Sequence, residues 1–224
     1  MSPELSAVLY RLVNASNFAV LPAVLVLALR WKRLSLPQRW FGRLLLAIAV
    51  IQLSAVALIV FFQQSNMPLY HAYIALEGPG LLLLYRYRLG NTPAGRFVPW
   101  VAGSYVVVVM VNVWWQQGVQ ELPSLPRSLE ALLLCGLALY YMRFVFLERK
   151  VMYLAQSFWF WLSAALLLYF SANLMLFLFT NTIPEAETDL FTGIWAIHAV
   201  LNFILYLIYS VALLCRDRES YSSF

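Results

Sequence analysis

Apolar residues along this chain fall into seven long runs, and short polar breaks separate one run from the next. Each run is about 18 to 25 residues long, which lets an α-helix cross a hydrocarbon core roughly 30 Å thick. The breaks are rich in proline, asparagine and serine and are too short to hold a separate domain. We therefore predict an all-α fold, a single seven-helix transmembrane domain over residues 1–224. Its helices are expected at about 6–29, 41–62, 69–88, 97–116, 128–147, 158–180 and 190–214.

The composition agrees with this pattern. Hydrophobic residues make up 63% of the chain and charged residues only 11%, whereas soluble domains are about half apolar and about a quarter charged. The net charge of +5 is better explained by the placement of the basic residues in the breaks than by a nucleic-acid-binding face. The chain is thus expected to be an integral membrane protein whose partner is the lipid bilayer, with no nucleic acid.

The basic residues also predict an orientation. Lys and Arg are retained on the cytoplasmic side during insertion. Alternate breaks collect all but two of the fifteen basic residues, and the two exceptions are Arg11 and Arg127. Arg127 is assigned to the outer break before the run at 128–147. We predict that the N-terminus is outside and the C-terminus inside.

The third run contains an acid followed directly by residues that disfavour a helix: Glu77, Gly78, Pro79 and Gly80. An ionisable group in hydrocarbon costs at least about 2.5 kcal/mol and normally faces a protein interior or a cavity. Proline removes a backbone donor and crowds the preceding turn, so the helix is expected to kink beside the carboxylate. Gly78, Pro79 and Gly80 are the candidate hinge, with a simple packing kink as the alternative.

Polar residues of several runs lie at one depth, about 10 to 12 Å from the outer end at 1.5 Å per residue. Helical spacing places aromatic residues on the same faces. The candidate ligand-binding residues are Glu77, His198, Asn202, Asn173, Asn14, Asn17, Tyr73, Tyr169 and Trp195. The asparagines could equally be interhelical contacts worth about 0.6 kcal/mol each.

No metal or cofactor is expected. The two cysteines, Cys135 and Cys215, show no metal-ligand spacing, and the chain has only two histidines, whereas zinc needs about three protein ligands. A retinal Schiff base is excluded because the lysines, Lys32 and Lys150, fall in breaks rather than in the bundle.

Three motifs carry a resemblance to a known family: LYHxYxxxE ending at Glu77, FW…LYFSxN ending at Asn173, and IWxIHxxxN ending at Asn202. Together they resemble a family of bacterial seven-helix inner-membrane proteins that has no established activity. The resemblance covers most of the chain. It implies location in the bacterial inner (plasma) membrane and a sensor kinase as partner.

Three functions fit the sequence. The first is a sensor or receptor-like module that binds a small molecule or lipid and signals through a partner, because short breaks cannot carry an output activity. The second is an intramembrane lipid hydrolase that uses Glu77 and His198. The third is a proton-coupled transporter. The sensor is preferred, and an enzyme is the less favoured class, with no catalytic residue assigned.

Overall fold

The structure is a computed structural model that describes residues 2–90, 92–116, 118–148, 154–179 and 188–215. Within these ranges all regular secondary structure is helical, which confirms the predicted all-α class. The α-helices are α1 (Pro3–Ser16), α2 (Leu21–Arg30), α3 (Leu36–Phe62), α4 (Met67–Leu89), α5 (Pro93–Val111), α6 (Ser124–Glu148), α7 (Phe158–Phe179) and α8 (Thr188–Leu214). Short 3-10 turns lie at Trp31–Arg33 and Leu154–Gln156, and a π-helical turn at Asn112–Gln116 continues α5.

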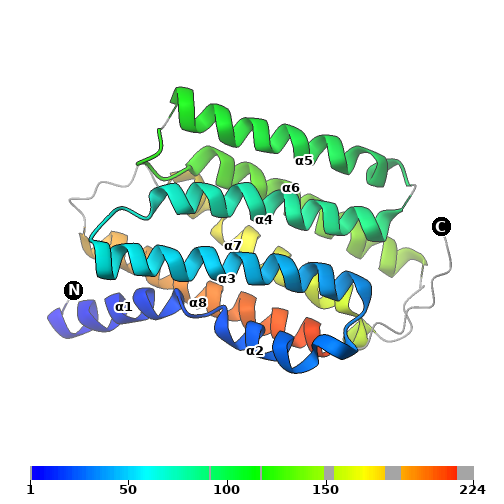
Figure 1. The fold of residues 1–224 in the computed structure, drawn as a ribbon, viewed down its shortest axis with the longest axis horizontal. Helices are drawn as coiled ribbons and strands as arrows, with labels where there is room; N and C mark the ends of the chain where they lie inside the picture. Colours follow the sequence, from blue (N-terminus) through cyan, green and yellow to red (C-terminus); the bar gives the residue numbers. More distant parts are fainter. Residues whose placement is uncertain (1, 91, 117, 149–153, 180–187, 216–224) are drawn as a thin grey trace.

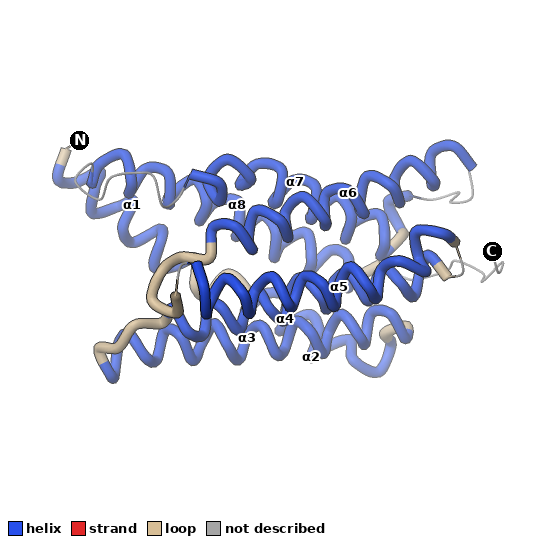
Figure 2. The backbone as a smooth tube through the Cα atoms, turned by 90° about the horizontal axis from the view of Figure 1, so that it is seen from above, coloured by secondary structure: helices blue, strands red, loops and turns tan. Residues whose placement is uncertain are grey.

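The helices form an elongated bundle in which they run side by side along its length (Figure 1). Consecutive helices from α3 to α8 are antiparallel, and α1 and α2 both pack on α8. Helix α4 lies between α3 and α5 and also contacts α6, while α7 packs between α6 and α8 (Figure 2). The chain reversals therefore bring the start of α1, the end of α3, and the starts of α4 and α6 to one end of the bundle.

Five helical segments are long and apolar enough to cross a membrane, as expected for an integral membrane protein: Glu4–Arg33, Leu36–Phe62, Pro93–Trp115, Phe158–Phe179 and Phe191–Leu214. The remaining long helices, α4 and α6, carry charged residues within their apolar stretches.

The prediction of one continuous helix over 6–29 is wrong. A turn over residues 17–20 separates α1 from α2. Pro22 stands in the first turn of α2 and has no N–H to donate to the carbonyl of Phe18. The chain instead makes tighter bonds three residues apart, such as Ala19 N–H to the Ser16 carbonyl at 3.1 Å.

Three other predicted helix starts are four or five residues too late, and one of them is that of α5, which begins at Pro93 instead of 97. Helix α3 begins at Leu36 instead of 41, where the Ser35 N–H donates to Gln38 Oε1 at 3.0 Å and caps the first turn. Helix α6 begins at Ser124 instead of 128. Arg127 is therefore in the bundle and does not belong to an outer break. Residue 180, the last of the predicted helix 158–180, lies outside the described residues. So do Arg149, Lys150, Arg216 and Arg218, four of the basic residues on which the predicted orientation is based.

Helix α4 is assigned as one α-helix from Met67 to Leu89, with Pro79 inside it. The glycines on either side of Pro79 allow close packing of neighbouring helices. A Cβ at Gly78 would lie 2.9 Å from Tyr105 Cε1, and one at Gly80 would lie 2.7 Å from Leu44 Cδ1. These glycines have a packing role on α4, and the hinge function remains a prediction.

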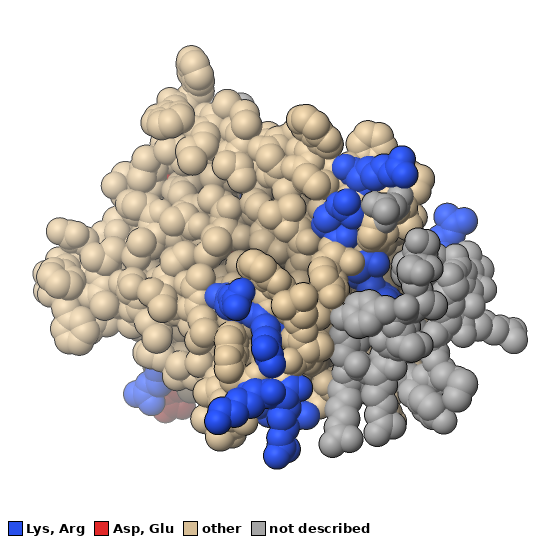
Figure 3. All heavy atoms as spheres, turned by 45° about the vertical axis from the view of Figure 1, so that its right-hand side comes forward, with Lys and Arg blue, Asp and Glu red and all other residues tan. Residues whose placement is uncertain are grey.

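The opposite end of the bundle is basic. Lys and Arg side chains of α2, the turn after it, and the adjoining ends of α3, α4 and α5 gather there (Figure 3). Arg30 Nη1 donates to the Leu214 carbonyl, and Gln38 Nε2 donates to the Cys215 carbonyl at 2.9 Å. Both side chains satisfy carbonyls at the C-terminal end of α8, which would otherwise have no helical partner. This end is called the basic end below.

Candidate functional site

Arg127 is the centre of a buried charge cluster. Its Nη1 lies 2.6 Å from Glu77 Oε2 on α4 and 2.6 Å from Glu130 Oε2, one turn further along α6. The exposed fractions are 2% for Arg127 and 1% for each glutamate. Residues three apart share a helix face, so Arg127 and Glu130 both point from α6 toward α4. Charges removed from water need such partners, and the three side chains supply them to one another.

Aromatic rings surround the Arg127 guanidinium. Its Cζ lies 5.0 to 5.2 Å from the ring centres of Tyr73, Phe170 and Phe177, and 5.9 Å from that of Tyr169. Cations at this distance from aromatic rings are attracted to the ring faces. Arg127 Nη2 also donates to the Tyr169 hydroxyl at 3.4 Å. The rings thus surround the guanidinium with apolar groups, and some of its N–H donors stay available.

Hydrogen-bonding capacity remains in the cluster. Tyr105 donates to Glu130 Oε2 at 3.5 Å. Glu130 Oε1 and Arg127 Nε are buried and have no hydrogen-bond partner among the described residues. Buried polar atoms of native proteins nearly always find a partner, often water or a ligand. The cluster can therefore accept further polar contacts.

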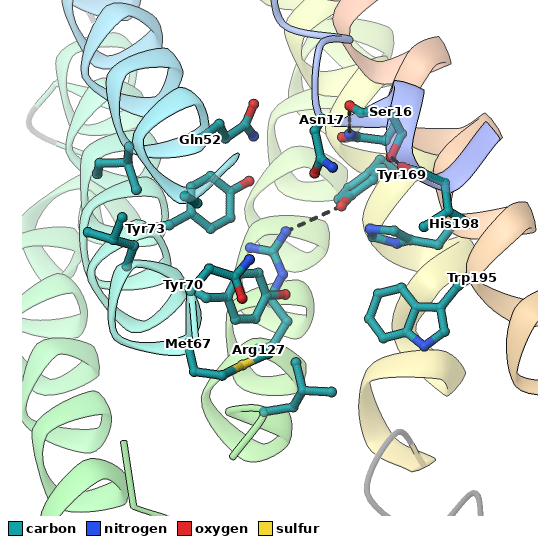
Figure 4. A pocket seen from close by; sticks show the side chains of 17 residues that line it. Ser16, Asn17, Gln52, Met67, Tyr70, Tyr73, Arg127, Tyr169, Trp195 and His198 are labelled. Carbon is teal, nitrogen blue, oxygen red and sulfur yellow. Dashed lines mark hydrogen bonds between the residues drawn. The ribbon is translucent and has the colours of Figure 1, made fainter. Parts of the chain in front are cut away.

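A cavity of about 230 Å³ lies next to this cluster. Arg127, Tyr73, Tyr169, Tyr70 and His198 all point toward it, from α4 and α6 on one side and from α7 and α8 on the other (Figure 4). Asn66 and Leu122, close to the ends of their loops, line it as well, so the cavity reaches the end of the bundle opposite the basic end. Polar groups converging on an aromatic-lined hollow are typical of a small-molecule site.

The histidine at the cavity wall has its tautomer set by an asparagine. Asn173 Nδ2 donates to the Tyr169 carbonyl at 2.8 Å, which leaves Asn173 Oδ1 as an acceptor for His198 Nδ1 at 2.9 Å. His198 Nδ1 then carries the proton, and Nε2 is the acceptor. The Trp195 ring packs against the imidazole with ring centres 5.2 Å apart. The cavity thus has a fixed acceptor opposite the Arg127 donor.

Asn202 connects α8 to the break between α1 and α2. Its Nδ2 donates to the Ser16 carbonyl at 3.1 Å, at the end of α1. Gln52 on α3 donates from Nε2 to the Tyr206 hydroxyl at 2.8 Å. Asn202 and Gln52 both line the cavity, so interhelical contact and cavity lining are combined in the same side chains.

The structure brings most of the predicted site residues to this cavity. Those that line it are Asn17, Tyr73, Tyr169, Trp195, His198 and Asn202. Asn173 is buried behind His198, and Glu77 is buried behind Arg127. Asn14 is exposed and does not line the cavity. Glu77 and His198 bind different partners, Arg127 and Asn173, and form no hydrogen bond with each other.

Sequence reasoning missed Arg127 and Glu130, the two α6 members of the cluster. The signal was available: Ser124 and Pro126 are typical of a helix start, and they place Arg127 and Glu130 three apart in its first turns. Among the described residues no three His, Cys, Asp or Glu side chains are grouped closely enough to hold a metal ion.

Comparison of the chain with protein-family models, curated proteins and solved structures finds no significant match. The resemblance to a bacterial seven-helix family therefore remains an expectation from the three motifs.

Proposed function

We propose that this protein is the ligand-binding module of a membrane receptor, which binds a small polar molecule in the cavity beside Arg127 and signals through a partner. The observation that carries the proposal is the combination of a buried cluster of three charges with an aromatic-lined cavity next to it. Keeping ionisable groups in a membrane bundle is costly, and they usually mark a functional site. The partner supplies the output, and the motif resemblance favours a sensor kinase in the bacterial inner membrane.

The receptor is proposed to have seven crossings, with α1 and α2 together as the first and with α4 and α6 added to the five apolar segments. The charges of Glu77, Arg127 and Glu130 pair inside the bundle, so they do not prevent α4 and α6 from crossing. The N-terminus is placed outside and the basic end on the cytoplasmic side. The cavity then opens to the outside.

This topology predicts a labelling pattern. In a protein with Cys135→Ala and Cys215→Ser, Gln64→Cys should react with an impermeant thiol reagent added to intact cells, because Gln64 is exposed at the cavity end. Lys32→Cys, exposed at the basic end, should react only after the membrane is opened. Reaction of Lys32→Cys in intact cells, with Gln64→Cys protected, would reverse the proposed orientation.

The charge of the cluster and the size of the cavity restrict the kind of ligand that can bind. The single positive charge of Arg127 is already matched by the two acids Glu77 and Glu130, so the cluster has no surplus positive charge to hold an anionic ligand. Arg127, whose side chain has only donors, and His198, whose Nε2 is an acceptor, both line the cavity. The volume of about 230 Å³ is below the roughly 300–1,000 Å³ of drug-sized sites. The ligand is therefore a small polar molecule, neutral or zwitterionic, that presents both an acceptor and a donor.

The ligand prediction is tested by filling the cavity without changing its polar groups. Ala55 lines the cavity, whereas Ala57, two residues further along α3, does not. Small polar compounds, sorted by net charge, are screened for thermal stabilisation of the purified protein. Neutral or zwitterionic compounds should stabilise it, by about 2.7 kcal/mol at a hundred times the dissociation constant. Ala55→Phe should abolish the effect and Ala57→Phe should retain it.

Stabilisation that survives Ala55→Phe would place the binding elsewhere, and stabilisation by carboxylates alone would contradict the charge argument. A screen in which no compound stabilises the wild-type protein would count against a ligand-binding role.

A proton-coupled transporter is the second candidate. The observation that favours it is that two carboxylates share one guanidinium nitrogen, so one proton would neutralise the cluster. Uptake of a stabilising compound into proteoliposomes discriminates the two roles, because a receptor does not accumulate its ligand. The hydrolase is not carried forward, because Glu77 and His198 are bound to different partners.

A further inference from the structure

A second, larger hollow lies between α3 and α4, outside the charge cluster. Its volume is about 630 Å³, and apolar side chains such as Leu44, Ala47, Leu76 and Leu83 form most of its wall. Leu83 is 48% exposed, so the hollow is a groove on the surface of the bundle and not an enclosed core cavity. This surface is called the α3–α4 groove.

The groove has the length of one leaflet. On α4 its lining extends from Leu76 to Tyr87, which corresponds to about 16 Å at 1.5 Å per residue. The hydrocarbon core of a bilayer is about 30 Å thick, so half of it is about 15 Å. Helix α3 is one of the five segments able to cross a membrane, and its groove residues lie in its first half, next to the basic end. A single acyl chain of that leaflet fits these dimensions.

The end of the groove is positively charged and aromatic. Arg43 and Arg86 both line it, together with Trp40 and Tyr87. The Arg43 guanidinium lies over the Trp40 ring at 4.9 Å, and Trp40 is 55% exposed. Arg86 Nη1 donates to the Gly90 carbonyl. Neither arginine is bound to a carboxylate among the described residues, so both charges are available to an anion. Tryptophan and tyrosine are enriched at headgroup depth.

We propose that the α3–α4 groove is a binding site for one anionic phospholipid. Its acyl chain lies along Leu44, Ala47 and Leu83, and its phosphate headgroup meets Arg43 and Arg86. Arginine forms strong charge-assisted hydrogen bonds with phosphate oxygens, and basic pockets between membrane helices on the cytoplasmic side bind anionic headgroups. The site is separate from the Arg127 cavity and does not depend on the receptor function.

The test uses the full chain in detergent with equal amounts of phosphatidylglycerol and phosphatidylcholine, and native mass spectrometry counts the lipids that stay bound. The wild-type protein should retain one phosphatidylglycerol in preference to phosphatidylcholine. Arg43→Gln should lower that preference about fivefold, and Arg43→Gln with Arg86→Gln should lower it by about the same factor again. Arg43→Gln alone leaves the bond from Arg86 to Gly90 intact and so guards against a folding defect.

Matched controls distinguish a specific lipid site from a general attraction of anionic lipid to the basic end. Arg33 and Arg96 are exposed arginines of the same end that do not line the groove, so Arg33→Gln with Arg96→Gln should keep the preference. Ala47→Phe, which narrows the apolar part, should reduce retention of both lipids. Inorganic phosphate should not displace the bound lipid, because it has no chain to occupy the groove. Equal retention of both lipids by wild type, an unchanged preference in the double variant, or an equal loss in the control pair would each overturn the proposal.

Discussion

Replacing Arg127 with methionine is expected to lower the free energy of unfolding by about 3–5 kcal/mol, because it leaves two buried carboxylates without their cation. Glu77 and Glu130 both depend on the same Nη1, at 2.6 Å, and each is only 1% exposed. Neither carboxylate is exposed enough for water to replace the lost guanidinium. The loss is therefore one of uncompensated charge, and the methionine side chain fills most of the vacated volume.

Denaturant unfolding of the purified protein in detergent measures this loss. Arg11→Met is the matched control, since Arg11 is exposed on α1, and it should change the free energy of unfolding by less than about 0.5 kcal/mol. Adding Glu77→Met and Glu130→Met to Arg127→Met should recover most of the stability, because a buried ion cluster can be replaced by apolar groups at little cost. A triple variant no more stable than Arg127→Met would show that the charges are not the cause.

Replacing Gly78 with valine should be the next most damaging change, with a cost of about 1–3 kcal/mol or more from overpacking. A Cβ there would lie 2.9 Å from Tyr105 Cε1 and 3.1 Å from Glu130 Oε1. Tyr105 is 1% exposed and donates to Glu130, so a shift of its ring also disturbs the charge cluster. The effect should therefore exceed that of a simple helix substitution.

Gly103→Val on α5 is the control for this change, because a Cβ at Gly103 would meet nothing within 4 Å. Both glycines are helical, so the intrinsic propensity change is the same, and only packing differs. The same denaturant measurement compares the two variants. Equal stabilities would mean that the close approach of α4 to α5 and α6 has no energetic importance.

The limits of prediction from sequence are seen best at α1, α2 and α6. Hydropathy identified each apolar segment, since burial in lipid requires only a long apolar run. It did not identify the break at residues 17–20, because Phe18, Ala19 and Val20 continue the apolar run through the turn and the hydrogen bond lost at Pro22 leaves no trace in hydropathy. It also placed Arg127 outside the bundle, since a charge at the edge of an apolar run looks like the end of a helix.

The candidate site was also predictable only in part. Helical spacing assigned Tyr73, Tyr169, Trp195, His198 and Asn202 to the polar faces of their helices, and all five line the cavity. Pairing across helices was beyond this reasoning. Nothing local to Glu77 indicates that its partner is fifty positions away on α6, because that contact depends on how α4 and α6 pack.

The break between α1 and α2 has a kinetic consequence. Helix α1 packs chiefly on α8, whereas α2 packs on both α8 and α3. Local opening is easiest where a segment has few packed neighbours, and it requires less free energy than unfolding of the whole bundle. Val13, Ser16 and Asn17 form the α1 wall of the cavity, held through Ser16 by Asn202. Undocking of α1 from α8 therefore opens the α1 side of the cavity on the microsecond-to-second scale of local unfolding, while the charge cluster stays in place.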